Sequence, residues 1–334
     1  MKMKNILFGI LLIIVVLLVW GCVRDKPQEP PIIPDDTNDF SLGSGDYDFS
    51  IQHDGLKRTY KVHVPSSYNK KVPTPFVLNF HGGGGNADAA RKASQMDLSS
   101  DKYGFIAIYP KGTGKIALGR LVATWNSGRG SVQAIESNID DVGFIEKMLD
   151  DLEVKFNMDK KRIYSTGISN GALMSYRLAC EMTDRIAAIA PIAGHDAYDY
   201  CNPSRPISVI HFHGAADNLA LYGGGQCGKH QIFKGDGWAC SSVQDYISTW
   251  RRTNKCPTES SITYQNGDAI CETYSPCDKN TEVTLCTIDG GGHTWPGGQL
   301  TNTQKWWTDI VGIVSQDISA NDAMWEFFER HPME

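Results

Sequence analysis

Short apolar runs alternate with segments of helical periodicity along most of the chain. Residues 76–80 and 105–109 are continuous apolar runs of strand length, while residues 140–156 carry apolar side chains at the spacing of one helix face. The same pattern predicts further strands at 162–166, 187–192, 207–212 and 282–288, and further helices at 87–102, 170–182, 242–254 and 320–330. Buried strands that alternate with helices indicate a mostly parallel sheet covered on both faces. The expected fold class is therefore α/β.

Two other segments have patterns of their own. Residues 47–64 alternate in two runs joined by Asp54-Gly55, which is the strongest short signal for a β-hairpin. Residues 111–131 are rich in glycine, contain Trp125 and are expected to form a loop.

The N-terminus predicts export. Lys2 and Lys4 precede an apolar run over residues 6–20, which is typical of a secretory signal and short of the roughly 20 residues of a membrane span. Gly21-Cys22 resembles a bacterial lipobox, so we expect residues 1–21 to be a lipoprotein-type signal peptide and Cys22 to be lipidated. A plain signal or an uncleaved anchor is the alternative, because Trp20 is bulky for its position. The expected location is the cell surface, the periplasm or the extracellular space.

Composition divides the remaining chain in two. Residues 22–45 are rich in proline, acidic residues and glycine, which indicates a disordered tether. Residues 46–334 are long enough for one large core, and we expect a single domain and a monomer. The net charge is −6, the pI is near 5.9 and no Lys/Arg cluster is present. These properties argue against a nucleic-acid partner and leave a lipid anchor as the expected contact with a membrane.

The cysteines suggest disulfides. The chain has nine, and setting Cys22 aside leaves an even number, which in an exported protein favours bridges over free buried thiols. No Cys-x-x-Cys occurs, so a zinc ribbon is disfavoured.

Ser169 is the candidate nucleophile. Residues 167–171 read Gly-Ile-Ser-Asn-Gly between a predicted strand and a predicted helix, the setting of a nucleophile elbow. The alternative is an ordinary serine that caps the helix, since serine is a favoured N-cap.

A serine nucleophile needs a base, and the base needs an acid to orient it. Asp217 follows the strand at 207–212, and His293 lies in a glycine loop after the strand at 282–288. The order Ser169, Asp217, His293 is the one expected on this architecture. Asp196 and Asp199 are rival candidates for the acid.

A glycine loop follows the strand at 76–80. Its sequence is His81-Gly-Gly-Gly-Gly, and backbone N–H groups at Gly83 and Gly84, with that of Asn170, are the predicted oxyanion hole.

These motifs together resemble the secreted polyhydroxybutyrate-depolymerase/feruloyl-esterase family of α/β-hydrolases over about residues 48–300. The motifs that carry the resemblance are His81–Gly84, Trp125-Asn126, Asp140–Phe144, Gly167–Ala172, His213–Asp217 and Gly292–Gly297. The resemblance implies an α/β-hydrolase domain over residues 46–334, Ser169 as nucleophile, Asp217 as acid and His293 as base.

The resemblance also implies two disulfides, Cys180–Cys201 and Cys256–Cys277. The other four cysteines depart from the family pattern. By elimination we expect Cys227–Cys240 and Cys271–Cys286, and the other pairings of these four stay open.

Other interpretations are weaker. His211 and His213 stand two apart on a strand, but no Asp-His pair follows closely as a metallohydrolase would need, so no metal is expected. Residues 82–87 match a dinucleotide fingerprint formally, but no acid ends a second strand, so no cofactor is expected. Asp140-Asp141 opens a helix, where it favours the helix dipole. Trp125, Trp238 and Trp295 are candidate substrate contacts.

The sequence therefore predicts a secreted serine esterase, with feruloyl or other phenolic esters of plant polysaccharide as the first choice of substrate. Polyhydroxybutyrate or another polyester, acetylated xylan, and acyl transfer to an alcohol on the same fold are the alternatives.

Overall fold

The computed structural model describes residues 40, 42–117, 120–128, 133–195, 201–228, 238–300 and 305–334. The predicted signal peptide, Cys22, almost all of the predicted tether, and the rival acids Asp196 and Asp199 lie outside the described residues. Among those described, no helix has both the length and the apolar character that a membrane crossing requires.

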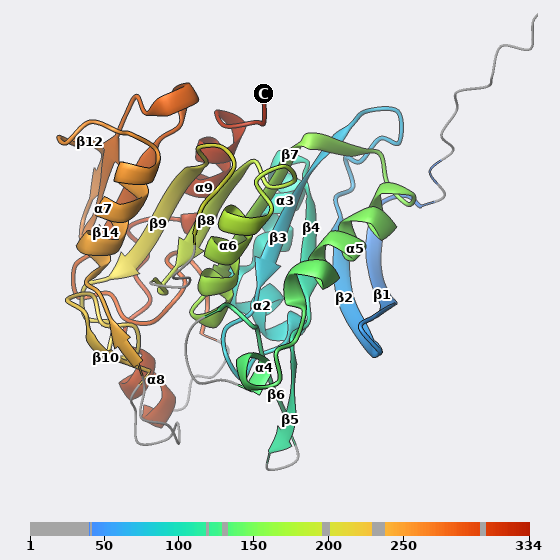
Figure 1. Cartoon of the computed structure of the whole chain (residues 1–334), viewed down its shortest axis with the longest axis horizontal. Coiled ribbons are helices and arrows are strands. Elements are labelled where there is room, and N and C mark those ends of the chain that lie inside the picture. The colour runs from blue at the N-terminus through green and yellow to red at the C-terminus, as the bar shows by residue number, and fades with distance from the viewer. Residues whose placement is uncertain are drawn as a thin grey trace, which may run out of the picture. The chain divides into compact units, whose positions relative to one another are not determined.

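A ten-stranded sheet forms the centre of the unit that spans residues 40–334 (Figure 1). Its middle strands run parallel, in the spatial order β4 (Ile106–Pro110), β3 (Thr74–Phe80), β7 (Met158–Ile168), β8 (Ala188–Ile192), β9 (Ser208–Gly214) and β14 (Val283–Ile288). Antiparallel hairpins extend both edges: β1 (Gly45–His53) with β2 (Leu56–Val64), and β12 (Ser261–Asn266) with β13 (Ala269–Tyr274). The mostly parallel sheet that the sequence predicts is confirmed.

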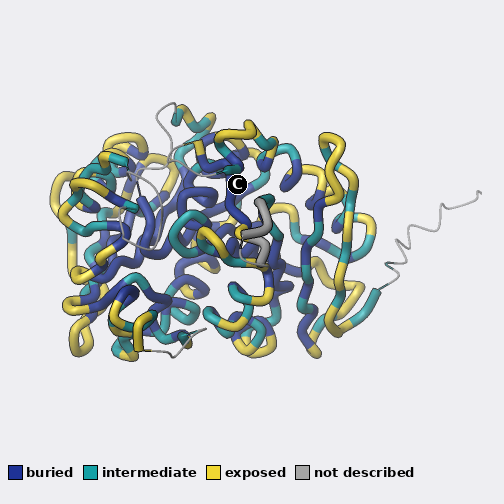
Figure 2. Tube along the Cα trace, turned by 90° about the horizontal axis from the view of Figure 1, so that it is seen from below, coloured by how far each residue is buried: buried dark blue, intermediate teal, exposed yellow. Residues whose placement is uncertain are grey.

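Helices cover both faces of the sheet, because successive residues of a strand point to opposite sides. In β3, Phe76 and Leu78 belong to one hydrophobic core and Val77 to the other. The first core is closed by α5 (Asp141–Glu153), α6 (Asn170–Glu181) and α7 (Val243–Thr253), and the second by α2 (Ala87–Ser94), α3 (Met96–Tyr103) and α9 (Ala320–Glu329). Figure 2 shows that the buried stretches of the chain lie in the interior and that the exposed residues lie mainly at the periphery.

Four disulfides cross-link this unit: Cys180–Cys201, Cys227–Cys240, Cys256–Cys277 and Cys271–Cys286. They join the pairs that the family resemblance implies and the pairs expected by elimination. Cys271 and Cys286 are directly opposite each other on β13 and β14. Each bridge restricts the unfolded chain and contributes about 2–4 kcal/mol to stability.

Three predictions about local structure are wrong or incomplete. The helix predicted over 87–102 is two helices, because Gln95 between them adopts a left-handed conformation with φ 53°. The loop predicted over 111–131 contains the hairpin β5 (Thr113–Ala117) and β6 (Arg120–Thr124). The sequence pattern also misses several elements: β12, β13, β10 (Gly225–Cys227), β11 (Trp238–Cys240), α4 (Gln133–Glu136), α8 (Lys305–Val311) and the 3₁₀ turn η1 (Asp278–Asn280).

Candidate active site

Ser169 lies on a sharp turn between β7 and α6. Its backbone has φ 59° and ψ −124°, and its side chain makes no capping bond to the helix. The turn passes close to β3, since a Cβ added at Gly171 would lie 2.3 Å from the carbonyl oxygen of Phe80. Glycine is therefore required there, and the geometry is that of a nucleophile elbow. The hydroxyl is not used as a helix cap, which was the competing interpretation.

The glycine loop after β3 lies directly against this turn. A Cβ added at Gly82 would be 3.4 Å from the Cβ of Ser169, and one at Gly83 would be 3.7 Å from the Cβ of Asn170. The N–H of Gly84, however, donates to the carbonyl oxygen of Ala123 at 2.8 Å. The prediction that Gly84 is an oxyanion donor is therefore wrong, because its hydrogen is already used. Gly83 and Asn170 remain the candidate donors.

Asp217 and His293 meet where the loops that follow β9 and β14 come together. The Nδ1–H of His293 donates to Oδ2 of Asp217 at 2.8 Å, while Oδ1 of Asp217 accepts from the N–H groups of Leu219 and Ala220, each at 2.8 Å. Burial by itself would raise the pKa of Asp217, but the charge of His293 and hydrogen bonds from His213 and His293 together hold it well below its usual range. In this arrangement His293 keeps Nε2 available to accept a proton.

The topology places the candidate residues on one edge of the sheet. Ser169 follows β7, Asp217 follows β9 and His293 follows β14, and these strands are parallel. Parallel strands bring their carboxyl ends to a common edge, which is where ligands bind in open α/β sheets. The glycine loop after β3 leaves from the same edge, next to β7.

Two of the three tryptophans predicted to contact substrate do not. Trp125 is fully buried and its indole N–H donates to the carbonyl oxygen of His81 at 3.0 Å. Trp295 is 3% exposed and its indole N–H donates to Asn321 at 3.0 Å. Both predictions are wrong, because each ring packs inside the protein. Trp238, half-buried on β11, remains a candidate.

The side chain of Asn170 has a role that the sequence did not reveal. Its Oδ1 accepts the N–H of Trp125 at 2.7 Å, and its Nδ2 donates to the carbonyl oxygen of the same residue at 3.2 Å. The side chain of Asn170, the residue after Ser169, thereby holds the backbone of Trp125 in the segment after β6 through two hydrogen bonds.

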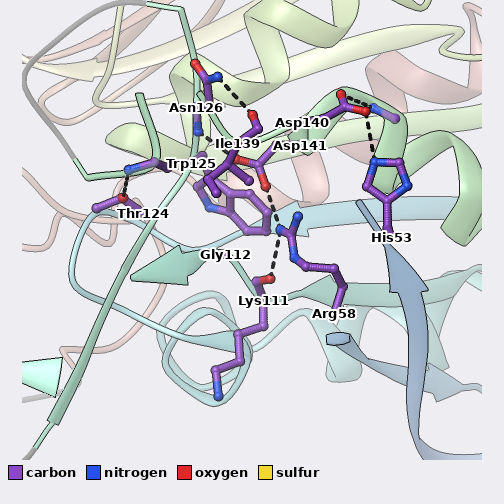
Figure 3. A network of polar contacts seen from close by, with 12 residues as sticks. His53, Arg58, Lys111, Gly112, Thr124, Trp125, Asn126, Ile139, Asp140 and Asp141 are labelled. Carbon is purple, nitrogen blue, oxygen red and sulfur yellow. Dashed lines mark hydrogen bonds and ion pairs between the residues drawn. The ribbon is translucent and has the colours of Figure 1, made fainter. Parts of the chain in front are cut away.

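A buried ion pair supports this segment from the other side (Figure 3). Arg58 Nη2 lies 2.5 Å from Oδ1 of Asp141, and the N–H of Asn126 donates to Oδ2 of Asp141 at 2.7 Å. The two charged side chains are 2% and 0% exposed. Of the Asp140-Asp141 pair, Asp140 caps the helix through the N–H of Gly143, as expected of an acid at a helix start. Asp141 lies in the first turn of the same helix, as expected, and in addition forms an ion pair with Arg58 that the sequence did not reveal.

His81 is held as a neutral ring by two backbone contacts. Its Nδ1–H donates to the carbonyl oxygen of Gly82 at 2.8 Å, and its Nε2 accepts the N–H of Gly112 at 3.0 Å. Burial lowers the pKa of His81 to about 4. A protonated ring would direct a second hydrogen at the N–H of Gly112, so His81 serves as a fixed support of the glycine loop.

We expect His81 to make the protein less stable in acid. The unfolded pKa is about 6.5 and the folded pKa is about 4, so the unfolded state binds more protons between these values and stability rises with pH across this window. The contribution is complete above pH 6.5 and falls by about 3 kcal/mol as the pH drops below 4. Urea unfolding of the wild type and of His81→Gln at pH 7, 5.5 and 4.5 measures it, and the variant is expected to show the smaller slope. Equal slopes would contradict the assignment.

One possible metal cluster lies near the acid loop in the described part of the chain. His195, Cys227 and Cys240 bring potential ligand atoms within 4.8 Å of one another. The two cysteines are bonded to each other, so neither offers a thiolate to a metal.

Comparison with known proteins adds a family to this geometry. Residues 59–217 match the family model described as "Esterase PHB depolymerase". Feruloyl esterase B of Piromyces equi is 30% identical over 244 residues, which are 72% of this chain and 43% of that protein. A bifunctional acetylxylan esterase/xylanase of Neocallimastix patriciarum is 24% identical over 78% of this chain and 34% of its own length. The chain thus spans less than half the length of these two relatives.

The fold is shared with a solved structure. An acetyl xylan esterase from Aspergillus awamori superposes with a TM-score of 0.55 at 15% identity, over 80% of this chain and 99% of that one. This likeness supports the fold. The family model and these relatives are consistent with the polyhydroxybutyrate-depolymerase/feruloyl-esterase family that the sequence motifs resemble.

Proposed function

We propose that the protein is an exported serine esterase that cleaves carboxylic esters through an acyl-enzyme. The observation that carries the proposal is the hydrogen bond of His293 to buried Asp217, on the sheet edge where Ser169 occupies the elbow. An acid, a base and a nucleophile in this relation are the parts that acyl transfer requires.

Each residue has one task in the proposed reaction. His293 Nε2 takes the proton of Ser169 as its oxygen attacks the ester carbonyl, and Asp217 orients the imidazole and stabilises its positive charge. The N–H groups of Asn170 and Gly83 receive the negative oxygen of the tetrahedral intermediate. His293 then gives its proton to the leaving alcohol, and water releases the acid by the same steps in reverse.

Phenolic esters of plant polysaccharide are the substrate class that we propose first. The relatives named as feruloyl and acetylxylan esterases support esters attached to polysaccharide in general. The family description includes depolymerases of polyhydroxybutyrate, so a polyester is the second candidate.

A release assay tests the function and the substrate class together. The full-length protein is incubated with methyl ferulate, acetylated xylo-oligosaccharides and hydroxybutyrate oligomers, and a fluorophosphonate probe is used to label the nucleophile. We expect labelling at Ser169 and a kcat/KM for methyl ferulate at least tenfold above those of the other two esters, a preference of about 1.4 kcal/mol. Labelling of Ser169 together with a different substrate preference would replace the proposed substrate class. If the probe labelled nothing and no ester were cleaved, the proposal of an esterase would be overturned. Added glycerol that diverts the acyl group from water would indicate a transferase.

A further inference from the structure

A chain of buried side chains leads from α6 to the candidate catalytic acid. The hydroxyl of Tyr176 lies 2.9 Å from Nδ1 of His211, and Nε2 of His211 lies 2.9 Å from Nδ1 of His213. Nε2 of His213 then lies 2.7 Å from the carbonyl oxygen of Ala220. Tyr176 is on the helix that begins beside Ser169, and the two histidines are on β9. All three side chains are fully buried or nearly so.

The last contact of this hydrogen-bonded series, from His213 to the carbonyl oxygen of Ala220, decides the direction of the other hydrogen bonds. A carbonyl oxygen only accepts, so Nε2 of His213 carries a hydrogen, and in a neutral ring its Nδ1 is then the acceptor. His211 must then donate from Nε2 and accept at Nδ1, which leaves Tyr176 as the donor to His211. With both rings neutral, each is the Nε2–H tautomer, and every donor in this series points toward the loop that carries Asp217.

The last donor reaches the acid as well as the loop. Nε2 of His213 lies 3.5 Å from Oδ2 of Asp217, the oxygen that also accepts from His293. Ala220, whose carbonyl His213 binds, donates its own N–H to Oδ1 of Asp217. His213 thus holds the turn that positions the carboxylate, and places an N–H dipole beside the oxygen that His293 uses.

We propose that His213 is a positioning residue for Asp217, with its donor oriented by His211 and Tyr176. This proposal rests on the proposed roles of Asp217 and His293. The donor shares part of the carboxylate's negative charge, so that Asp217 orients His293 without holding its proton too tightly.

Several titratable groups surround the Tyr176–His211–His213 series. The titratable groups that face it are Tyr176 on α6, His195 after β8, His211 on β9, Asp217 and Tyr222 after β9, Tyr246 on α7, and His293 after β14. Burial, with the neighbouring His213 and His195, lowers the pKa of His211 well below its usual range. Burial also raises the pKa of Tyr176 well above its usual range. A neutral His211 and a protonated Tyr176 hydroxyl are what this donor direction requires of those two residues.

Substitution of His213 separates positioning from packing. In His213→Leu we expect kcat to fall about 10- to 100-fold, because the hydrogen bond that holds the Ala220 turn and the N–H dipole beside the Asp217 carboxylate are both lost, and KM to change less than about twofold. The acid limb of the pH–rate profile should move upward, by about 0.3 to 0.5 pH unit, because an unshared carboxylate holds the His293 proton more tightly. His213→Gln, whose amide nitrogen can replace Nε2, should restore kcat to within about threefold of the wild type.

His331→Leu is the matched control. His331 is a buried histidine whose Nδ1–H donates to the carbonyl oxygen of Phe327 at 2.7 Å, outside the chain described above. Its loss should reduce stability without moving the pH profile. An acid limb of His213→Leu that stays in place or moves downward would show a packing role only, and would overturn the proposal. Failure of His213→Gln to restore kcat would do the same.

A second measurement does not depend on ester hydrolysis. Nitrogen NMR of the full-length protein with ¹⁵N-labelled histidine should show His211 and His213 as neutral Nε2–H tautomers between pH 6 and 8. An Nδ1–H tautomer or a titrating ring at either position would overturn the proposal. A wild type that hydrolyses no ester, but shows these tautomers, would instead overturn the proposed function and with it the catalytic meaning of the chain.

Discussion

Ser169→Ala is expected to lower kcat/KM for any ester substrate by a factor of about 10⁴ or more, because it removes the proposed nucleophile while the proposed oxyanion site and substrate binding remain. The fold should be unaffected. The serine side chain makes no capping bond to α6, and the backbone strain at φ 59° is the same for alanine as for serine. Steady-state kinetics on p-nitrophenyl acetate, together with the thermal unfolding midpoint, measures both effects.

Ser175→Ala is the control on the same helix. Ser175 lies inside the protein, where its hydroxyl accepts a hydrogen bond from Ser165 at 2.8 Å and donates to the carbonyl oxygen of Gly171 at 3.2 Å. Its loss should cost about 1 kcal/mol of stability and leave turnover within about threefold of the wild type. The nucleophile assignment would be wrong if Ser169→Ala retained wild-type turnover, or if both variants lost activity in proportion to lost stability.

The sequence predicts the parts of this fold that are continuous in the chain. Buried runs such as residues 76–80 stand out because parallel strands are apolar on both faces. The exposed edge strand β12 leaves no such pattern, since every residue of it is exposed. The break at Gln95 also escapes prediction, because glutamine is a good helix former and its left-handed backbone conformation is imposed by its surroundings.

The candidate site was predictable where function depends on loops at strand ends, and less so where it depends on packing. Ser169, Asp217 and His293 stand out in the sequence because of their order along the chain and the glycines near them. Trp125 and Trp295 carry no signal that separates a pocket wall from a core, and only burial and the partners of their indole N–H groups decide. Exclusion of Gly84 likewise requires the pairing of its N–H with Ala123, a residue 39 positions away.

The buried ion pair between Arg58 and Asp141 is the structural feature for which we expect the largest effect on stability. Both side chains are excluded from water, and Asp141 also accepts the N–H of Asn126. Asp141→Asn keeps an oxygen that can accept the N–H of Asn126. The other group of the amide, which is the uncharged NH2 donor, then faces the guanidinium of Arg58. The charge of Arg58 would then be buried without a counterion, at a cost of about 3–5 kcal/mol in the free energy of unfolding. Urea unfolding at pH 7 measures this loss.

Asp150→Asn is the matched control, because Asp150 is on the same helix and also pairs with an arginine. Asp150 is 61% exposed, and its partner Arg185 keeps a second contact with Glu153, so we expect a change below about 0.5 kcal/mol. Similar losses in the two variants would contradict the special role of burial.

The effect of Asp141 should also reach the catalytic edge of the sheet. The segment that Asp141 holds through Asn126 is the one that Asn170 pairs with through Trp125, and Asn170 follows the nucleophile directly. If Asp141 no longer holds Asn126, the segment Trp125-Asn126 becomes less rigid. Asn170, whose N–H is a candidate oxyanion donor, then loses part of its support. We therefore expect Asp141→Asn, assayed where it is fully folded, to lower kcat about tenfold while KM changes little. Combined with Asn170→Ala, its effect on kcat should be smaller than in the wild type, because both substitutions break one connection. Additive effects of the two would show that the ion pair stabilises the fold without supporting the site.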